Sequence, residues 1–214
     1  MLHNKKLSDK ARYGITLALG TMVVLWRVFF ASNVEITVGT VLIVNVLDLI
    51  VTIAVIWLNK DELKAIFKQK FTGKDLLKVI GFFLVYFFMT SVLDLGGGFG
   101  FERSPANDVI GEFLTIFPFG AFISGGILAP IWEEVVFRFA GEKLIKNKIL
   151  FVLITTFLFV FIHTGFALTT GLFYVQTGLT LAIIYLITND LRLVIILHFI
   201  GNNIGWLFML FGLM

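Results

Sequence analysis

Three ionisable side chains lie within six residues of an otherwise apolar stretch: Glu133, Glu134 and Arg138, in Glu-Glu-Val-Val-Phe-Arg. A charged side chain inside a membrane is costly, so such a cluster is a functional-site hypothesis by default. Residues four apart share a helix face, and we therefore predict that Glu134 pairs with Arg138. Glu133 lies about 100° round the helix from Glu134, need not share the arginine, and is free to face the histidines of the chain. The two adjacent carboxylates are thus predicted to have different roles.

Two histidines and an asparagine are the predicted partners of this cluster. His163 and His198 lie in separate apolar segments, and Asn202 follows His198 by four residues, on the same helix face. A Glu–His pair can take a proton from water. A second histidine and an amide can donate hydrogen bonds to a developing oxyanion, each worth about 3 kcal/mol. We discount Asn203, because it could replace Asn202 only through a change of helix register.

The same side chains allow a metal-assisted alternative. Two histidines and one carboxylate can bind a divalent cation such as zinc, with water in the open position. The ligands would then be Glu133, His163 and His198. The sequence lacks the His-Glu-x-x-His signature of the common zinc peptidases. We therefore favour a site that requires no cofactor.

Composition indicates the elements that position these residues. Of 214 residues, 58% are hydrophobic and 14% charged, and the apolar residues come in long blocks. This is typical of a polytopic membrane protein. The absence of cysteine excludes disulfides and thiol nucleophiles. We predict an all-α bundle of about seven membrane-spanning helices, forming a single integral-membrane domain over residues 1–214. Its motif-bearing catalytic core covers about residues 113–213. The predicted spans are about 13–31, 36–58, 79–95, 113–140, 149–168, 171–188 and 193–213.

Two connectors are distinctive. Residues 59–78 are rich in lysine, with Leu63, Ile66 and Phe67 at helical spacing. They form either an amphipathic helix on the membrane surface or a solvated loop. Residues 96–112 are predicted to be a glycine-rich loop, which is weak support for phosphate binding because no Gly-Lys-Ser/Thr follows it.

The distribution of basic residues predicts the topology. The basic stretches 1–12, 59–78 and 141–148, together with Arg192, fall on one side of a seven-span arrangement. By the positive-inside rule this side is cytoplasmic, so the N-terminus is predicted to lie in the cytoplasm. No cleavable signal peptide is evident, and the first span is expected to remain as an anchor.

Pro130 predicts an irregularity beside the carboxylates. Proline cannot donate an N–H to the preceding turn, so the helix is expected to kink or restart there. At 1.5 Å per residue, Glu133 lies about 12 Å from the basic link and His163 about 21 Å from it. We expect a tilted or broken fourth span, or a fifth span that projects from the bilayer, to reconcile the two depths. The polar residues predicted to bond between helices are Asn45, Asp48, Asp94 and Gln176.

Three motifs occur in order on three apolar segments: Glu-Glu-x-x-x-Arg at 133–138, Phe-x-x-x-His at 159–163 and His-x-x-x-Asn at 198–202. Together they resemble the CPBP family, the CAAX proteases and bacteriocin-processing enzymes that are also called Abi-type intramembrane proteases. The resemblance covers the segment from Pro130 to Asn202. One departure is Phe139, where many members have glycine after the motif arginine.

The resemblance implies an intramembrane endopeptidase. Glu133 and His163 would activate the hydrolytic water, and His198 and Asn202 would form the oxyanion hole. Glu134 and Arg138 would hold the helix of Glu133 in place.

The resemblance also implies a peptide or protein substrate at or in the bilayer, no nucleic acid, and an integral location, with composition favouring a bacterial cell membrane. Bacteriocin leaders and signalling-peptide precursors are the expected substrates in a bacterium. The alternative is a non-enzymatic immunity or peptide-binding membrane protein that retains the motifs. A proton-relaying transporter is disfavoured because no inverted repeat is visible.

Overall fold

The computed structural model describes residues 7–95, 105–164 and 171–211, and every regular element among them is a helix. The all-helical prediction is therefore confirmed for the described residues. The elements are α1 (Asp9–Asn33), α2 (Val38–Leu58), α3 (Lys60–Phe67), α4 (Gly73–Leu95), α5 (Pro105–Ile116), α6 (Pro118–Ala121), η2 (Phe122–Leu128), α7 (Ala129–Glu133), η3 (Glu134–Ala140), α8 (Gly141–Leu144), α9 (Lys148–Thr164), α10 (Gly171–Thr188) and α11 (Leu191–Leu210).

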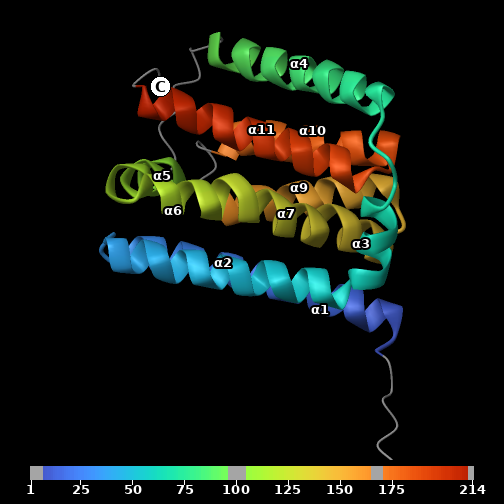
Figure 1. Cartoon of the computed structure of the whole chain (residues 1–214), viewed down its shortest axis with the longest axis horizontal. Helices are drawn as coiled ribbons and strands as arrows, with labels where there is room; N and C mark the ends of the chain where they lie inside the picture. Colours follow the sequence, from blue (N-terminus) through green and yellow to red (C-terminus); the bar gives the residue numbers. More distant parts are fainter. Residues whose placement is uncertain (1–6, 96–104, 165–170, 212–214) are drawn as a thin grey trace, which may run out of the picture.

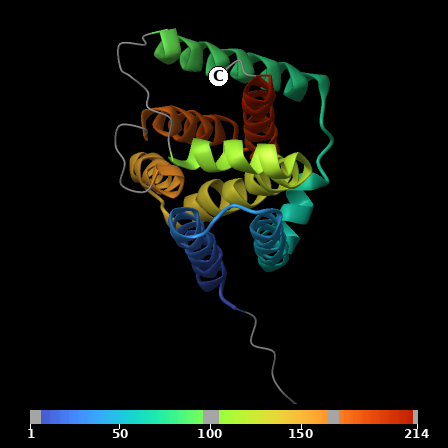
Figure 2. The same cartoon turned by 90° about the vertical axis from the view of Figure 1, so that its left-hand side faces the viewer.

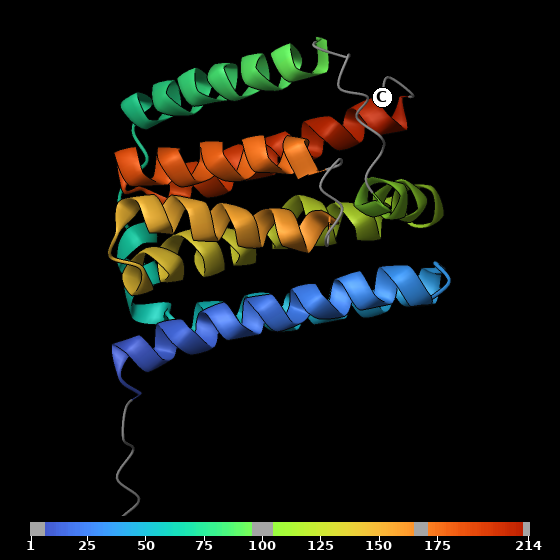
Figure 3. The same ribbon diagram turned by 180° about the vertical axis from the view of Figure 1, so that it is seen from behind.

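The helices are arranged in layers around the segment that carries the two carboxylates. Helices α1 and α2 lie side by side in the lower layer of Figure 1, and both contact the helix that runs from α6 to α8. Helices α10 and α11 pack on its other side, and α4 lies outermost against them, as Figure 2 shows end-on. Seen from behind in Figure 3, α9 and α10 run side by side. The carboxylates are thus enclosed by layers on both sides.

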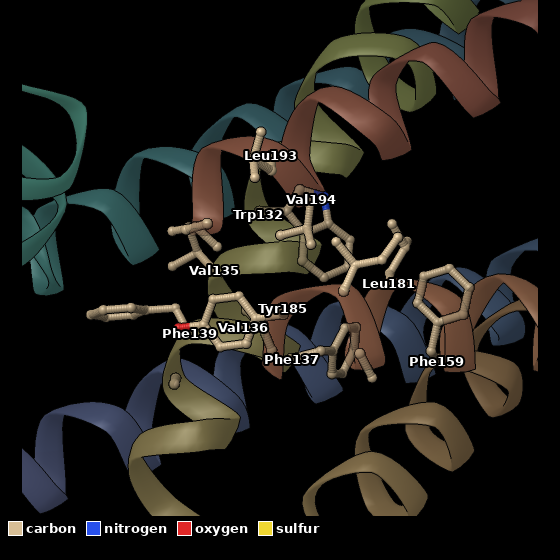
Figure 4. Packing of buried hydrophobic residues seen from close by; sticks show 14 of the residues in the cluster. Trp132, Val135, Val136, Phe137, Phe139, Phe159, Leu181, Tyr185, Leu193 and Val194 are labelled. Carbon is tan, nitrogen blue, oxygen red and sulfur yellow. The ribbon is translucent and has the colours of Figure 1, made fainter. Parts of the chain in front are cut away.

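The core is centred on the helix around Glu133 and Glu134. Figure 4 shows Trp132, Val136 and Phe137 packing against side chains from other helices, among them Leu181 of α10 and Leu193 of α11. Each residue from 132 to 141 is buried, so this part of the helix has no face toward the surroundings. A helix that is buried all round is typical of the centre of a bundle.

Two helices in the described part of the chain are long and apolar enough to cross a membrane: Val38–Leu58 and the continuous helix Pro118–Leu144. Their surroundings differ, because α2 exposes apolar side chains such as Ile53 and Trp57, whereas the second helix is mostly buried. Exposed apolar side chains of this kind suit contact with lipid. The number of seven spans stays a prediction.

The basic stretches meet at one end of the bundle. Arg12 of α1 forms an ion pair with Glu62 of α3, and Arg192 Nη1 of α11 donates to the Gln69 carbonyl at 2.7 Å. The hydrogen bond from Arg12 lowers the pKa of Glu62 to about 2. These contacts hold the start of α1 to α3, and the start of α11 to the residues that follow α3. Which side of the membrane this end faces stays a prediction.

The lysine-rich connector is divided between two helices. Residues 60–67 are helical and bury Leu63, so the helical alternative is right for this part. Helix α4 begins at Gly73 rather than near residue 79. The reason is a cap: the Thr72 N–H donates to Asp75 Oδ2 at 2.9 Å and the Asp75 N–H to Thr72 Oγ1 at 3.3 Å.

The predicted loop at 96–112 and the predicted span at 113–140 are both wrong in their boundaries. Helix α5 begins at Pro105, since proline suits the first turn of a helix, and it ends at Ile116. Phe117 then interrupts the helix with φ −148° and ψ 77°, and a new helix begins at Pro118. Residues 96–104 and 165–168, at which other predicted boundaries fall, and the side chain of Asp94 lie outside the described residues.

Candidate active site

The helix that carries the carboxylates is wound wider than an α-helix on both sides of Glu133. Segments η2 and η3 are π-helical, with α7 between them. At the end of η2, the Ala129 N–H donates to the Ser124 carbonyl five residues earlier. The helix continues through Pro130 from Pro118 to Leu144, so the predicted restart at Pro130 is wrong. The predicted irregularity beside the carboxylates is present as the change of winding, and the kink stays a prediction. Wide turns of this kind are frequent at functional sites.

Glu134 and Arg138 form a buried ion pair. Arg138 Nε lies 3.2 Å from Glu134 Oε2, and neither side chain is exposed to solvent. The pairing predicted from their spacing is therefore confirmed. Arg138 Nη2 also donates to the Gly178 carbonyl at 3.4 Å, and its guanidinium lies over the Phe159 ring, 5.3 Å from the centroid. The arginine thus ties η3 to α9 and α10.

His198 lies between the two carboxylates. Its Nδ1 is 2.9 Å from Glu134 Oε1, and its Nε2 is 3.8 Å from Glu133 Oε2. An ionised carboxylate can only accept a hydrogen bond, so Nδ1 carries a proton and donates it to Glu134. Glu133 faces a histidine, as predicted. The hydrogen bond from His198 to Glu134 was not predicted, because nothing in the spacing links two helices so far apart in the chain.

One aromatic ring joins the two histidines. The Phe159 centroid lies 4.5 Å from that of His163 and 5.6 Å from that of His198. His163 also stacks on Tyr174, with centroids 4.4 Å apart and planes 20° from parallel. Its Nδ1 lies 2.7 Å from the Phe159 carbonyl, so Nδ1 donates and Nε2 is the basic nitrogen. Tyr174 was missed, because no signal in the sequence separates it from the many other aromatic residues.

The two asparagines of α11 both reach the turn before Pro130. Asn202 Nδ2 donates to the Gly125 carbonyl at 2.9 Å, and Asn203 Nδ2 donates to the Gly126 carbonyl at 3.2 Å. Both asparagines reach η2, since the wide turn presents neighbouring carbonyls to both amides. The choice of Asn202 over Asn203 for the oxyanion hole stays a prediction. A primary amide has two N–H groups, and Asn202 uses one of them on Gly125.

Glu133 and His198 are closed to the surroundings, at 1% and 4% exposed, whereas His163 and Asn202 are half-buried. Among the described residues, no group of three His, Asp, Glu or Cys side chains is arranged to hold a metal ion. We therefore derive no step through a metal, and the absence of a cofactor stays a prediction.

Of the described polar residues that were predicted to bond between helices, Asp48 and Gln176 do so and Asn45 does not. Asp48 accepts a hydrogen bond from Ser124 of η2, and both side chains are buried. Gln176 Nε2 donates to the Tyr86 carbonyl of α4 at 3.5 Å. These two contacts join different helices. Asn45 instead donates to a carbonyl of its own helix at 2.8 Å.

Comparison with known proteins gives a family match over the segment that holds this site. Residues 115–204 match the Rce1-like family, described as type II CAAX prenyl endopeptidase Rce1-like. The matching segment begins in α5 and ends after Asn202, so it includes all three motifs. Over this segment the chain is therefore similar to the CAAX protease family, the family that the motifs resemble. This family implies protease activity and a membrane-embedded location.

Comparison with individual proteins gives a distant relative. The chain is 30% identical over 141 residues to UPF0177 protein YaiH of Lactococcus lactis subsp. lactis strain IL1403. The match covers 64% of this chain and 57% of that protein, so the chain spans little more than half of the relative's length. No solved structure gives a significant match to the chain.

Proposed function

We propose that this protein is an intramembrane endopeptidase that hydrolyses a peptide bond of a peptide or protein at the membrane. The observation that carries the proposal is the placement of His198 between Glu133 and Glu134 inside the segment that matches the family. Buried carboxylates in contact with a histidine are suited to proton transfer.

In the proposed reaction, Glu133, assisted by His163, takes a proton from water. The water oxygen then bonds to the carbonyl carbon of the substrate, and the carbonyl oxygen becomes an oxyanion. When the carbon–nitrogen bond breaks, the departing amine receives the proton held by the carboxylate. No co-reactant other than water is needed.

His198 and Asn202 would stabilise the oxyanion. Because Nδ1 of His198 donates to Glu134, Nε2 can donate to an oxyanion only when the ring is protonated and cationic. The carboxylate of Glu134, 2.9 Å from Nδ1, would compensate the charge of that cation while Glu133 holds the proton taken from water. Asn202 would contribute the N–H group of its amide that is not directed at Gly125. Each well-placed donor is typically worth about 3 kcal/mol of transition-state stabilisation.

The second candidate is a membrane protein that binds a peptide or confers immunity without cleaving anything. The burial of Glu133 and His198 favours it, because a protease must also admit water and substrate to these side chains. The two candidates differ in whether Glu133 is needed for the appearance of new peptide termini.

The test compares peptide termini in host membranes that express the wild type, Glu133→Gln or Glu142→Gln. Glu133→Gln keeps the shape of the side chain and removes its basicity. Glu142, on the same helix but partly exposed and paired with Lys143, is the matched control. We expect termini with the wild type and the control that are absent with Glu133→Gln. Identical termini in all three, at equal abundance of folded protein, would support the binding protein instead.

Metal dependence is tested in the same membranes. Cleavage that persists after treatment with a chelator is expected for a site in which Glu133 and histidine alone activate water. Cleavage lost with the chelator and restored by zinc would instead assign Glu133, His163 and His198 as ligands.

A further inference from the structure

Pro130 leaves backbone acceptors without their usual donor. In an α-helix the N–H of residue 130 would bond to the carbonyl of Gly126, and in a π-helix to that of Gly125. Proline has no N–H, so this donor is missing whichever winding is adopted. The preceding segment η2 is π-helical, and it delivers both carbonyls to the same side of the turn.

Two side chains of α11 bond to the two carbonyls that this one missing donor could have reached. Asn202 donates to Gly125 at 2.9 Å and Asn203 donates to Gly126 at 3.2 Å. In a membrane interior, a freed carbonyl must be satisfied by neighbouring protein. The second N–H of Asn203 also has an acceptor, because the same nitrogen lies 2.7 Å from the Phe199 carbonyl of its own helix. The asparagine therefore bridges two helices with one amide.

This bridge lies beside the proposed reacting groups. Asn203 is little more than one turn beyond His198 on α11, and Pro130 is nearly one turn before Glu133 on α7. A bond between the two turns sets how far α11 can slide along α7. The distance from His198 Nε2 to Glu133 Oε2, now 3.8 Å, depends on that register.

We propose that Asn203, which lies outside the three motifs, is a positioning residue that replaces the hydrogen bond withheld by Pro130 and so holds His198 in register with Glu133. The expected effect of Asn203 on cleavage rests on the proposed function, whereas its expected effect on stability does not. Either expectation can therefore fail without the other.

The test is a double-mutant cycle of Asn203→Leu and Pro130→Ala, read by thermal unfolding of the full chain in detergent. Asn203→Leu keeps the approximate size and removes the donor. We expect it to lower Tm by about 2 to 10 °C, because a carbonyl loses its partner. Pro130→Ala restores a backbone N–H, so in that background Asn203→Leu is expected to lower Tm by less than half as much. The part that remains reflects the lost bond to Phe199.

The matched control is Asn45→Leu. Asn45 is also half-buried, but its amide donates within α2, so Pro130→Ala should leave the effect of Asn45→Leu unchanged. Asn203→Ala is measured beside Asn203→Leu, because the two differ in volume and share the loss of the donor. Coupling to Pro130→Ala in both variants supports the proposal. Equal losses of Tm in the two backgrounds, or coupling in only one of the variants, overturns it.

Cleavage gives the second readout. At a temperature well below every Tm, Asn203→Leu is expected to lower kcat about tenfold or more with little change in KM, because the reacting groups shift while the substrate still binds. Pro130→Ala should restore most of the loss. If Asn203→Leu yields no folded protein, recovery of folded protein in the double variant is the expected rescue, and failure to recover it overturns the proposal.

Discussion

Replacing Glu134 by glutamine tests the buried ion pair most directly. Glu134 Oε2 and Arg138 Nε are 3.2 Å apart with no exposure to solvent. At an effective dielectric constant of about 20, charges at that distance attract by about 5 kcal/mol. Removing one charge leaves the other buried without compensation, which typically costs about 3–5 kcal/mol. For a chain of this length, we expect Glu134→Gln to lower Tm by about 6 to 20 °C.

The decisive comparison is with Arg138→Met and with the double variant, measured by thermal unfolding in the same detergent. Arg138→Met leaves the Glu134 carboxylate without its cation and should also be strongly destabilising. The double variant removes both charges and is expected to lose less stability than either single variant, because a neutral pair needs no compensation. A double variant whose loss equals the sum of the single losses would refute the reasoning that the two charges act as a pair.

Two further changes probe the positioning helices. The stability that Glu62 gains from Arg12 is present above pH 4.5 and is lost as the pH falls toward about 2, so the difference in Tm between wild type and Glu62→Gln should shrink over that range. The contribution of this ion pair to the free energy of unfolding should stay within about 1 kcal/mol, because the pair is partly exposed. A methyl group on Gly20 would lie 2.5 Å from Val136 Cγ1. Gly20→Ala should therefore lower the free energy of unfolding by about 1–3 kcal/mol. Adding Val136→Ala should remove the overlap and recover much of that loss. Gly14→Ala on the same helix meets nothing and is the control; an equal loss there would point to the backbone of α1 instead.

Much of the site could be predicted because the interactions concerned join residues that are close together on one helix. Apolar blocks predict helices, and spacing along one helix predicted that Glu134 pairs with Arg138 and that Glu133 faces away from it. The order of the three motifs predicted the similarity to the CAAX protease family without any knowledge of the fold. Each of these inferences needs only the geometry of a single helix.

What could not be predicted depends on contacts between helices and on a change of winding. The hydrogen bond from His198 to Glu134 joins α11 to η3, and no periodicity encodes it. The role of Asn203 depends on carbonyls that a regular α-helix would have turned elsewhere. Pro118 marks the interruption at Phe117, but the helix continues through Pro130, so the presence of a proline does not by itself show where a helix ends. Hydropathy reports burial in the membrane and does not report where one helix gives way to the next.

The wide turns on either side of Glu133 have a consequence for comparing sequences of different length. Each ring of a π-helix encloses one residue more than a ring of an α-helix. A single residue can therefore be deleted from η2 or η3 and the turn can still close, now as an ordinary α-helix. Because the wide turn and the ordinary turn each bring the chain round about once, such a deletion would leave the side chains on both sides of it facing nearly the same way. Two relatives could then present the same residues to His198 although the number of residues along this helix differs by one, and an alignment without a gap there would pair residues that do not correspond.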